Sequence, residues 1–134
     1  MNYWKFQGRN ITSTPPDTWG FVYIITNILN NKKYIGQKSF YSVKSNPKTK
    51  NKKSIVESNW ENYYGSNKIL KADVKKHGVD YFKREILMFC TCKSDLNYYE
   101  MKYQVVNEVL ESDEWYNEWI NYKGRGPKRP WQCV

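Results

Sequence analysis

The sequence predicts one α+β domain in which a three-stranded antiparallel sheet is flanked by helices. Two strand-like segments, residues 21–26 and 33–36, are separated by an asparagine-rich turn, and a third strand-like run covers residues 81–90. Helical spacing of apolar residues is found at 67–77 and 94–110. A chain of 134 residues fits a single domain, because domain lengths cluster near about 100–150 residues.

Three parts are expected along the chain. Residues 1–19 are predicted to be an irregular lead-in, because Pro15 and Pro16 lack backbone donors and hold the chain extended. The folded domain is expected over residues 20–122, and residues 123–134 form a basic C-terminal tail.

The first two strands are predicted to form a β-hairpin. Side chains alternate between the two faces of a strand, so Phe21, Tyr23 and Ile25 share one face of the first strand. Tyr34 and Gly36 share one face of the second. The two tyrosines can therefore converge on the same side of the sheet.

A lysine-rich loop is expected at residues 44–53, where the sequence has almost no apolar side chain. It is either a solvated insertion or a segment that reaches along a phosphate backbone, and the sequence favours neither interpretation. The candidates for nucleic-acid binding in this loop are Lys44, Lys48, Lys50, Lys52 and Lys53.

Two helices and a further helical segment are predicted after this loop. Asn67 is a suitable N-cap for the first helix and Gly78 a suitable stop, while Ser94 is the expected cap of the second. Glu100 lies inside the apolar stripe of the second helix, where an ionised carboxylate is costly to bury unless a cation, a metal or a donor compensates it. Residues 115–122, which are rich in aromatic side chains, are expected to form a further helix.

Charge favours a polyanionic partner. Lysine and arginine total 22 against 13 acidic residues, which gives a formal net charge of +9. A basic surface attracts phosphate backbones through counterion release. Lysine outnumbers arginine 18 to 4, so a merely soluble surface is the alternative.

Membrane and secreted classes are not favoured. The apolar runs are far shorter than the roughly 20 residues that cross a bilayer, and the N-terminus has no signal-peptide pattern. The three cysteines lack the spacing of a disulfide framework, and Cys90 and Cys92 are closer together than the usual cysteine pair of a zinc site. We therefore expect a soluble cytoplasmic protein with reduced thiols.

Two short triplets carry a family resemblance. The triplet Phe21-Val22-Tyr23 follows Gly20, and Tyr34-Ile35-Gly36 comes ten residues later. In this order they resemble the two motifs of the GIY-YIG nuclease family, although only the second triplet is literal. The resemblance is closest to the short phage-encoded homing-type endonucleases, in which a lysine follows the second triplet, as Lys38 does here. A phage-encoded protein would act in the host-cell cytoplasm.

The resemblance continues downstream of the hairpin. It includes residues 64–67, the end of the first helix at 76–78 and the third strand. It then reaches Glu100, where the family carries its metal-binding glutamate, and Asn117, which resembles the family's late asparagine. The match covers roughly residues 20 to 120 and implies a GIY-YIG-like fold.

What the resemblance implies is a DNA endonuclease that hydrolyses phosphodiester bonds with Mg²⁺, for which Mn²⁺ can substitute. Tyr23 would take a proton from the attacking water, and Tyr34 would position the water or the phosphate. Lys38 would supply positive charge, and Glu100 would bind the metal, since Mg²⁺ often takes only one or two protein carboxylates. Asn117 would support the site. The alternative for Glu100 is an ion pair with a lysine or an arginine.

One position departs from the family pattern. Family members commonly carry an arginine some eight to ten residues after the second triplet, whereas this sequence has Lys44 in that region. Lysine lacks the bidentate fork with which arginine matches a phosphate. Lys38, Lys44 or Arg84 would have to substitute, and Arg84 is the least favoured because strand arginines are usually structural.

A non-catalytic DNA- or RNA-binding module that retains the nuclease fold is the alternative function. The sequence favours neither a monomer nor a homodimer. A monomer with one site predicts nicking, and a homodimer predicts double-strand cleavage.

Overall fold

A computed structural model describes residues 2–45, 53–124 and 126–127 of the chain. It contains a five-stranded sheet with the order β2-β1-β7-β3-β4 and a separate two-stranded ribbon of β5 and β6. The strands are β1 (Trp4–Phe6), β2 (Arg9–Ile11), β3 (Gly20–Asn27), β4 (Lys32–Ser39), β5 (Tyr41–Ser45), β6 (Lys53–Glu57) and β7 (Phe82–Cys90). The helices are α1 (Lys68–His77) and α2 (Lys93–Val106), with short 3-10 turns at Trp60–Asn62 and Val79–Tyr81.

The predicted hairpin and third strand are confirmed. β3 pairs antiparallel with both β4 and β7, and Tyr23 lies opposite Gly36 while Ile25 lies opposite Tyr34. The turn between β3 and β4 uses Asn31 with a positive φ of 60°, a conformation that asparagine adopts more readily than most residues. In the order of the described sheet β4 is an edge strand, so no further strand of that sheet pairs with its outer side.

The prediction of a three-stranded antiparallel sheet is wrong in size and in type. β1 pairs in parallel with β7, and β2 pairs antiparallel with β1, so the sheet is mixed and five-stranded. Residues 1–19 are consequently not irregular throughout. The two prolines restrict only their own neighbourhood, whereas Gln7 and Gly8, both with positive φ, turn the chain so that two three-residue strands can pair. Strands this short leave no readable alternation in the sequence.

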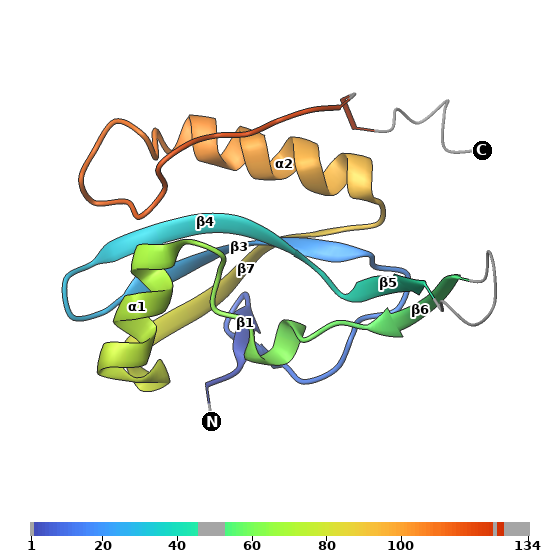
Figure 1. The fold of residues 1–134 in the computed structure, drawn as a ribbon, viewed down its shortest axis with the longest axis horizontal. Helices are drawn as coiled ribbons and strands as arrows, with labels where there is room; N and C mark the ends of the chain where they lie inside the picture. Colours follow the sequence, from blue (N-terminus) through green and yellow to red (C-terminus); the bar gives the residue numbers. More distant parts are fainter. Residues whose placement is uncertain (1, 46–52, 125, 128–134) are drawn as a thin grey trace.

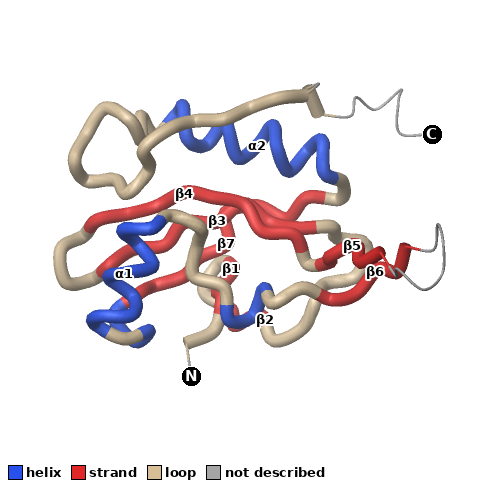
Figure 2. The backbone as a smooth tube through the Cα atoms, in the orientation of Figure 1, coloured by secondary structure: helices blue, strands red, loops and turns tan. Residues whose placement is uncertain are grey.

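The lysine-rich segment was predicted to be a loop over residues 44–53, but both of its ends belong to β-strands. Lys44 and Ser45 belong to β5 and Lys53 belongs to β6, and these strands pair antiparallel. Figure 2 shows this ribbon projecting from one end of the domain. Residues 46–52 lie outside the described residues.

A layer of helix covers one face of the sheet. α2 contacts β3, β4 and β7 and contributes Leu96 to a core cluster with Val22, Ile35 and Cys90. On the opposite face, Leu70 of α1 belongs to a second cluster. Figure 1 shows α2 above the sheet and α1 on its other side.

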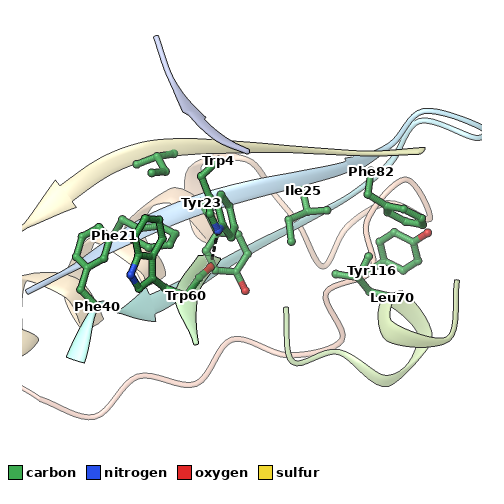
Figure 3. Close-up of a cluster of buried hydrophobic side chains, with 10 residues drawn as sticks. Trp4, Phe21, Tyr23, Ile25, Phe40, Trp60, Leu70, Phe82 and Tyr116 are labelled. Carbon is green, nitrogen blue, oxygen red and sulfur yellow. Dashed lines mark hydrogen bonds between the residues drawn. The ribbon is translucent and has the colours of Figure 1, made fainter. Parts of the chain in front are cut away.

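The second cluster is dominated by aromatic rings. Phe21, Tyr23 and Ile25 of β3 all point into it, as the alternation predicts. Trp4 also lies there, and its Nε1 donates a hydrogen bond of 2.7 Å to the carbonyl oxygen of Trp60. Figure 3 shows Tyr23 among the side chains of this cluster, in which it is buried. The burial of Trp4, which is 1% exposed, explains why the N-terminal segment joins the sheet.

The first helix matches its prediction and the later helices differ from theirs. The Asn67 side chain accepts hydrogen bonds from the backbone N–H groups of Ile69 and Leu70, and Gly78 ends α1. α2 begins at Lys93, so Ser94 is inside the helix and not its cap. The described residues 107–124 contain no helix, which contradicts the helix predicted over 115–122.

The segment after α2 instead runs beside the free edge of β4. The N–H of Lys33 donates to the carbonyl oxygen of Glu114, and the N–H of Tyr116 donates to the carbonyl oxygen of Lys33. An isolated parallel bridge joins Lys33 and Trp115. Edge pairing and burial of Tyr116 hold this segment extended, which the aromatic composition alone could not reveal. Neither helix in the described part of the chain is long and apolar enough to span a membrane.

Candidate active site

A cavity of about 550 Å³ lies beside β4, where α1, α2 and the segment after α2 meet. Its walls include Tyr34, Lys68, Glu100 and Asn117. Tyr34 reaches the cavity from the face of the sheet that α1 covers, and Glu100 reaches it from α2 on the opposite face. The edge position of β4 is what allows side chains from both faces to meet.

The two tyrosines of the triplets converge as predicted. The centroids of the Tyr23 and Tyr34 rings are 6.2 Å apart. Gly36 makes this possible: a Cβ atom at this position would lie 2.5 Å from the Tyr23 hydroxyl oxygen and 2.8 Å from the Tyr34 ring. Real Cβ contacts are not this short, so the glycine of the second triplet is required by the close approach of the two rings.

Tyr23 is fully buried. Its exposed fraction is 0%, and burial raises its pKa well above the usual value, with further increases from Tyr63, Tyr34 and Glu100. A phenol in this position is held neutral and away from solvent. The structure thus places Tyr23 behind the cavity wall.

Tyr34 has the opposite placement, because it lines the cavity and is only partly buried. Its hydroxyl oxygen lies 3.1 Å from the hydroxyl oxygen of Ser66. Burial raises the pKa of Tyr34, the hydrogen bond to Ser66 lowers it, and the charge of Glu100 raises it. Tyr34 is therefore the tyrosine whose hydroxyl can meet a substrate.

Lys38 lies on the same face of β4 as Tyr34, as the alternation predicts. Its ammonium nitrogen is 4.4 Å from the centre of the Tyr63 ring, and Tyr63 also contacts Tyr23 edge-on with centroids 6.1 Å apart. Burial lowers the pKa of Lys38. Lys38 does not line the cavity, so its charge acts from beside it.

Glu100 is a partly buried carboxylate on the cavity wall. One of its oxygens accepts a hydrogen bond of 3.2 Å from the side-chain amide of Gln37. Burial raises its pKa, and the hydrogen bonds from Gln37 lower it. Among the described residues Glu100 forms no ion pair, so the predicted alternative of a lysine or Arg84 partner has no support there.

The apolar stripe that singled out Glu100 is only half correct. Tyr99 and Tyr103 pack against the core cluster of that face, whereas Val106 is 69% exposed and Leu110 47% exposed. The helix ends at Val106, and Val109 is the buried residue of the following turn. The predicted apolar stripe therefore runs past the end of the helix, but its first part, which includes Glu100, lies in the helix as predicted.

Asn117 fastens the segment after α2 to β4. Its side-chain oxygen accepts from the N–H of Ile35 at 3.1 Å, and its side-chain nitrogen donates to the carbonyl oxygen of Ile35 at 2.9 Å. Both of its polar atoms are thus committed, and the side chain is 8% exposed. This geometry supports a positioning role for Asn117.

The other predicted cations do not reach the cavity. Lys44 is exposed on β5 and is absent from the cavity walls. Lys48, Lys50 and Lys52 lie outside the described residues, as does the side chain of Lys53. Arg84 is buried, with its guanidinium 4.5 Å from the Trp4 ring centre and 4.2 Å from that of Tyr64. Arg84 donates to the backbone oxygens of Tyr63 and Asn2, which is a structural role.

The site predicted from the sequence omits several side chains of the cavity, among them Lys68, Glu118 and Trp119. Lys68 directly follows the N-cap Asn67, so a predicted helix start next to the resemblance at 64–67 was the available signal. Glu118 and Trp119 follow Asn117, but the predicted helix over this segment obscured their position. The described residues contain no cluster of three or more histidine, cysteine or acidic side chains around one point.

Comparisons with known proteins identify the family of the chain. A family model described as "Putative endonuclease segE, GIY-YIG domain" matches residues 4–120. Two proteins of Enterobacteria phage T4 are similar to the chain. "Putative endonuclease segE" is 30% identical over 97 residues, which are 72% of this chain, and "Putative endonuclease segD" is 32% identical over 105 residues, which are 77% of it.

These alignments cover 39% of the length of each of the two phage proteins, so the chain corresponds to well under half of either relative. No solved structure gives a significant match. The family model nevertheless spans most of the chain, including both triplets and Glu100. The chain therefore belongs to the GIY-YIG endonuclease family.

Proposed function

We propose that this protein is a divalent-metal-dependent DNA endonuclease that hydrolyses phosphodiester bonds. The observation that carries the proposal is one cavity lined by the phenol of Tyr34, the carboxylate of Glu100 and the lysine Lys68, where Glu100 has no ion-pair partner among the residues that the structure describes. Hydrolysis of a phosphodiester requires an activated water, positive charge near the phosphate and stabilisation of the leaving oxygen. The net charge of +9 suits a nucleic-acid substrate.

Glu100 is the residue that would hold the metal. Burial raises the pKa of the Glu100 carboxylate, and Glu100 forms no ion pair among the described residues, so its charged form is costly and a bound divalent cation would remove that cost. One carboxylate is compatible with Mg²⁺, which keeps several of its waters, and Mn²⁺ has similar ligand preferences. A metal held by Glu100 would supply positive charge to the phosphoryl oxygens and to the leaving oxygen.

Tyr34 is the residue that would take the proton of the attacking water. As the water oxygen bonds to phosphorus, its proton moves to the Tyr34 phenolate, and the bond from phosphorus to the leaving sugar oxygen breaks. We assign this role to Tyr34 because its hydroxyl borders the cavity, whereas that of Tyr23 is buried. Tyr23 would support the ring of Tyr34 from behind.

Lys68 is the residue that would replace the family arginine on the phosphate. It is exposed, it lines the cavity, and it stands in the first turn of α1, where the helix dipole adds positive potential. Lys38 would add charge from the face of the sheet behind Tyr34. Two lysines that act as point charges are a weaker clamp than one bidentate arginine.

Replacing Lys68 by alanine is expected to lower the cleavage rate by about 10- to 100-fold, because a charged group that stabilises the phosphoryl transition state is lost. Lys75→Ala is the matched control, since Lys75 is an exposed lysine on the same helix that does not line the cavity. Single-turnover rates on one DNA duplex measure the difference. Equal effects of the two substitutions would mean that Lys68 contributes only general surface charge.

A cleavage assay with the purified protein tests the function itself. With Mg²⁺ or Mn²⁺, plasmid DNA is expected to be cut, and with excess chelator it is expected to stay intact while remaining bound. Nicked circles would indicate one active site per complex, and linear product would indicate paired sites. If DNA is bound but never cut with either metal, the protein is a binding module that has kept the nuclease fold.

A further inference from the structure

We propose that Trp119 stacks on the base of an unstacked nucleotide beside the phosphate that is cut, and that the enzyme therefore prefers DNA with an unpaired nucleotide at that place. This inference rests on the proposed nuclease function. It assigns a specificity determinant to a residue that plays no part in the chemistry described above.

Trp119 is an unusually exposed indole. Its exposed fraction is 69%, whereas Trp4 and Trp60 are each 1% exposed. It also lines the same cavity as Tyr34, Lys68 and Glu100. A large aromatic surface left in water beside a polar cavity is typical of a binding residue rather than of a packing residue.

The backbone before Trp119 is held from two directions. On one side, Tyr116 and Asn117 hydrogen-bond to the backbone of Lys33 and Ile35 in β4. On the other side, the Asn67 side chain donates to the carbonyl oxygen of Tyr116 at 2.9 Å and to the Glu118 carboxylate at 3.2 Å. A ring presented from a fixed backbone loses little conformational freedom when it stacks on a ligand.

The groups that line the cavity beside Trp119 favour a nucleotide base as its stacking partner. Lys68 and the Tyr34 hydroxyl would contact the phosphate, so the neighbouring base would reach the exposed indole of Trp119, which lines the same cavity. The volume of about 550 Å³ is within the usual range of about 300–1,000 Å³ for ligand sites. Every base has a flat face that an indole can cover, which makes this contact tolerant of sequence.

The proposed contact would therefore select DNA by whether the nucleotide at the cut is base-paired. In an intact duplex both faces of a base are covered by its neighbours, so stacking on Trp119 requires that the base leave the helix. This step is easiest for a base that has no pairing partner. Trp119 would therefore discriminate between DNA structures more than between sequences.

The test compares two DNA duplexes of identical sequence, one fully paired and one with a single unpaired nucleotide at the position where the paired duplex is cut. Binding is measured in chelator and cleavage in Mg²⁺. The wild type is expected to prefer the second duplex by about tenfold in binding, at the lower end of what base–aromatic stacking contributes. Trp119→Ala should lose this preference, and Trp119→Phe should keep most of it.

Tyr81→Ala is the control, because Tyr81 is an aromatic residue that is 44% exposed outside the cavity. It should keep the full preference. A preference that is absent in the wild type, or unchanged in Trp119→Ala, would overturn the inference while leaving the nuclease function intact. If Trp119→Ala instead converts a dimer into a monomer, Trp119 belongs to a subunit interface and the inference is also overturned.

The binding measurement separates this inference from the proposed function. If neither duplex is cut with any metal, the nuclease proposal fails. The comparison of the two duplexes in chelator would still report whether Trp119 recognises an unpaired base.

Discussion

Replacing Glu100 by glutamine is expected to lower metal-dependent cleavage by at least about 100-fold while changing DNA affinity by less than about threefold. Glutamine keeps the size of the side chain and can still accept the hydrogen bond from Gln37. It removes the charge that would attract Mg²⁺. Single-turnover cleavage and binding in chelator, on the same duplex, measure the two quantities separately.

The same substitution should change stability in a direction that identifies a metal site. Burial raises the pKa of Glu100, so the folded protein holds the neutral acid more tightly than the unfolded chain does. The stability that this group contributes is full below its unfolded pKa and is lost as the pH rises through the higher folded pKa. At neutral pH the charged form is therefore a cost, and Glu100→Gln without metal should melt at or above the temperature of the wild type.

Added Mg²⁺ should raise the melting temperature of the wild type and leave that of Glu100→Gln unchanged, because only the wild type binds the ion in its folded state. At Mg²⁺ concentrations well below saturation, the cleavage rate of the wild type should also fall with acidification at a higher pH than an ordinary glutamate would give, because protons compete with Mg²⁺ for the metal-free carboxylate, whose pKa is raised by burial. Glu118→Gln is the matched control, since Glu118 is the other carboxylate on the cavity wall and is exposed. If Glu118→Gln abolishes cleavage and the Mg²⁺ effect while Glu100→Gln does not, the metal assignment belongs to Glu118.

A residue of this site can be predicted from the sequence when it lies in a regular helix or strand. Tyr23, Tyr34 and Gly36 were placed correctly because strand alternation has a fixed period and the asparagine turn sets the hairpin. Glu100 stood out because a carboxylate interrupts an apolar helical stripe. Both signals depend only on the spacing of residues within one helix or strand, and this spacing can be read from the sequence.

The rest of the site depends on contacts between distant segments. Lys68 and Trp119 are 51 positions apart, and only the pairing of the segment after α2 with the edge of β4 brings them to one cavity. That pairing consists of a few backbone bonds and the Asn117 side chain, which leave no periodic pattern. The N-terminal strands β1 and β2 were missed for the same reason, because the burial of Trp4 against Trp60 is visible only in three dimensions.

The substitution of Tyr34 by phenylalanine is expected to lower the cleavage rate by about 10²- to 10⁴-fold, the usual contribution of a general base. Tyr23→Phe, by contrast, should lower it by less than about tenfold. The two substitutions remove the same atom from neighbouring rings whose centroids are 6.2 Å apart, so they are matched controls for each other. Single-turnover rates in Mg²⁺ measure both.

The difference follows from where each hydroxyl lies. Tyr23 is 0% exposed, so its hydroxyl meets only protein. Its loss removes the hydrogen bond with the Tyr63 side chain and should instead destabilise the fold by about 1 kcal/mol, the typical contribution of one hydrogen bond. Tyr34 borders the cavity, and its raised pKa means that the phenolate becomes more abundant only as the pH rises. The wild-type rate should therefore increase toward alkaline pH, and the residual rate of Tyr34→Phe should not.

The reverse result would restore the role that the family resemblance implies for Tyr23. A large loss in Tyr23→Phe with an unchanged melting temperature would mean that the buried hydroxyl becomes accessible when DNA binds. That outcome would require the chain to rearrange, because Tyr23 is 0% exposed and its hydroxyl packs in the space that the missing side chain of Gly36 leaves free. Because Tyr23 is buried in this packing and Tyr34 lines the cavity, we expect Tyr34→Phe to have the larger effect on cleavage.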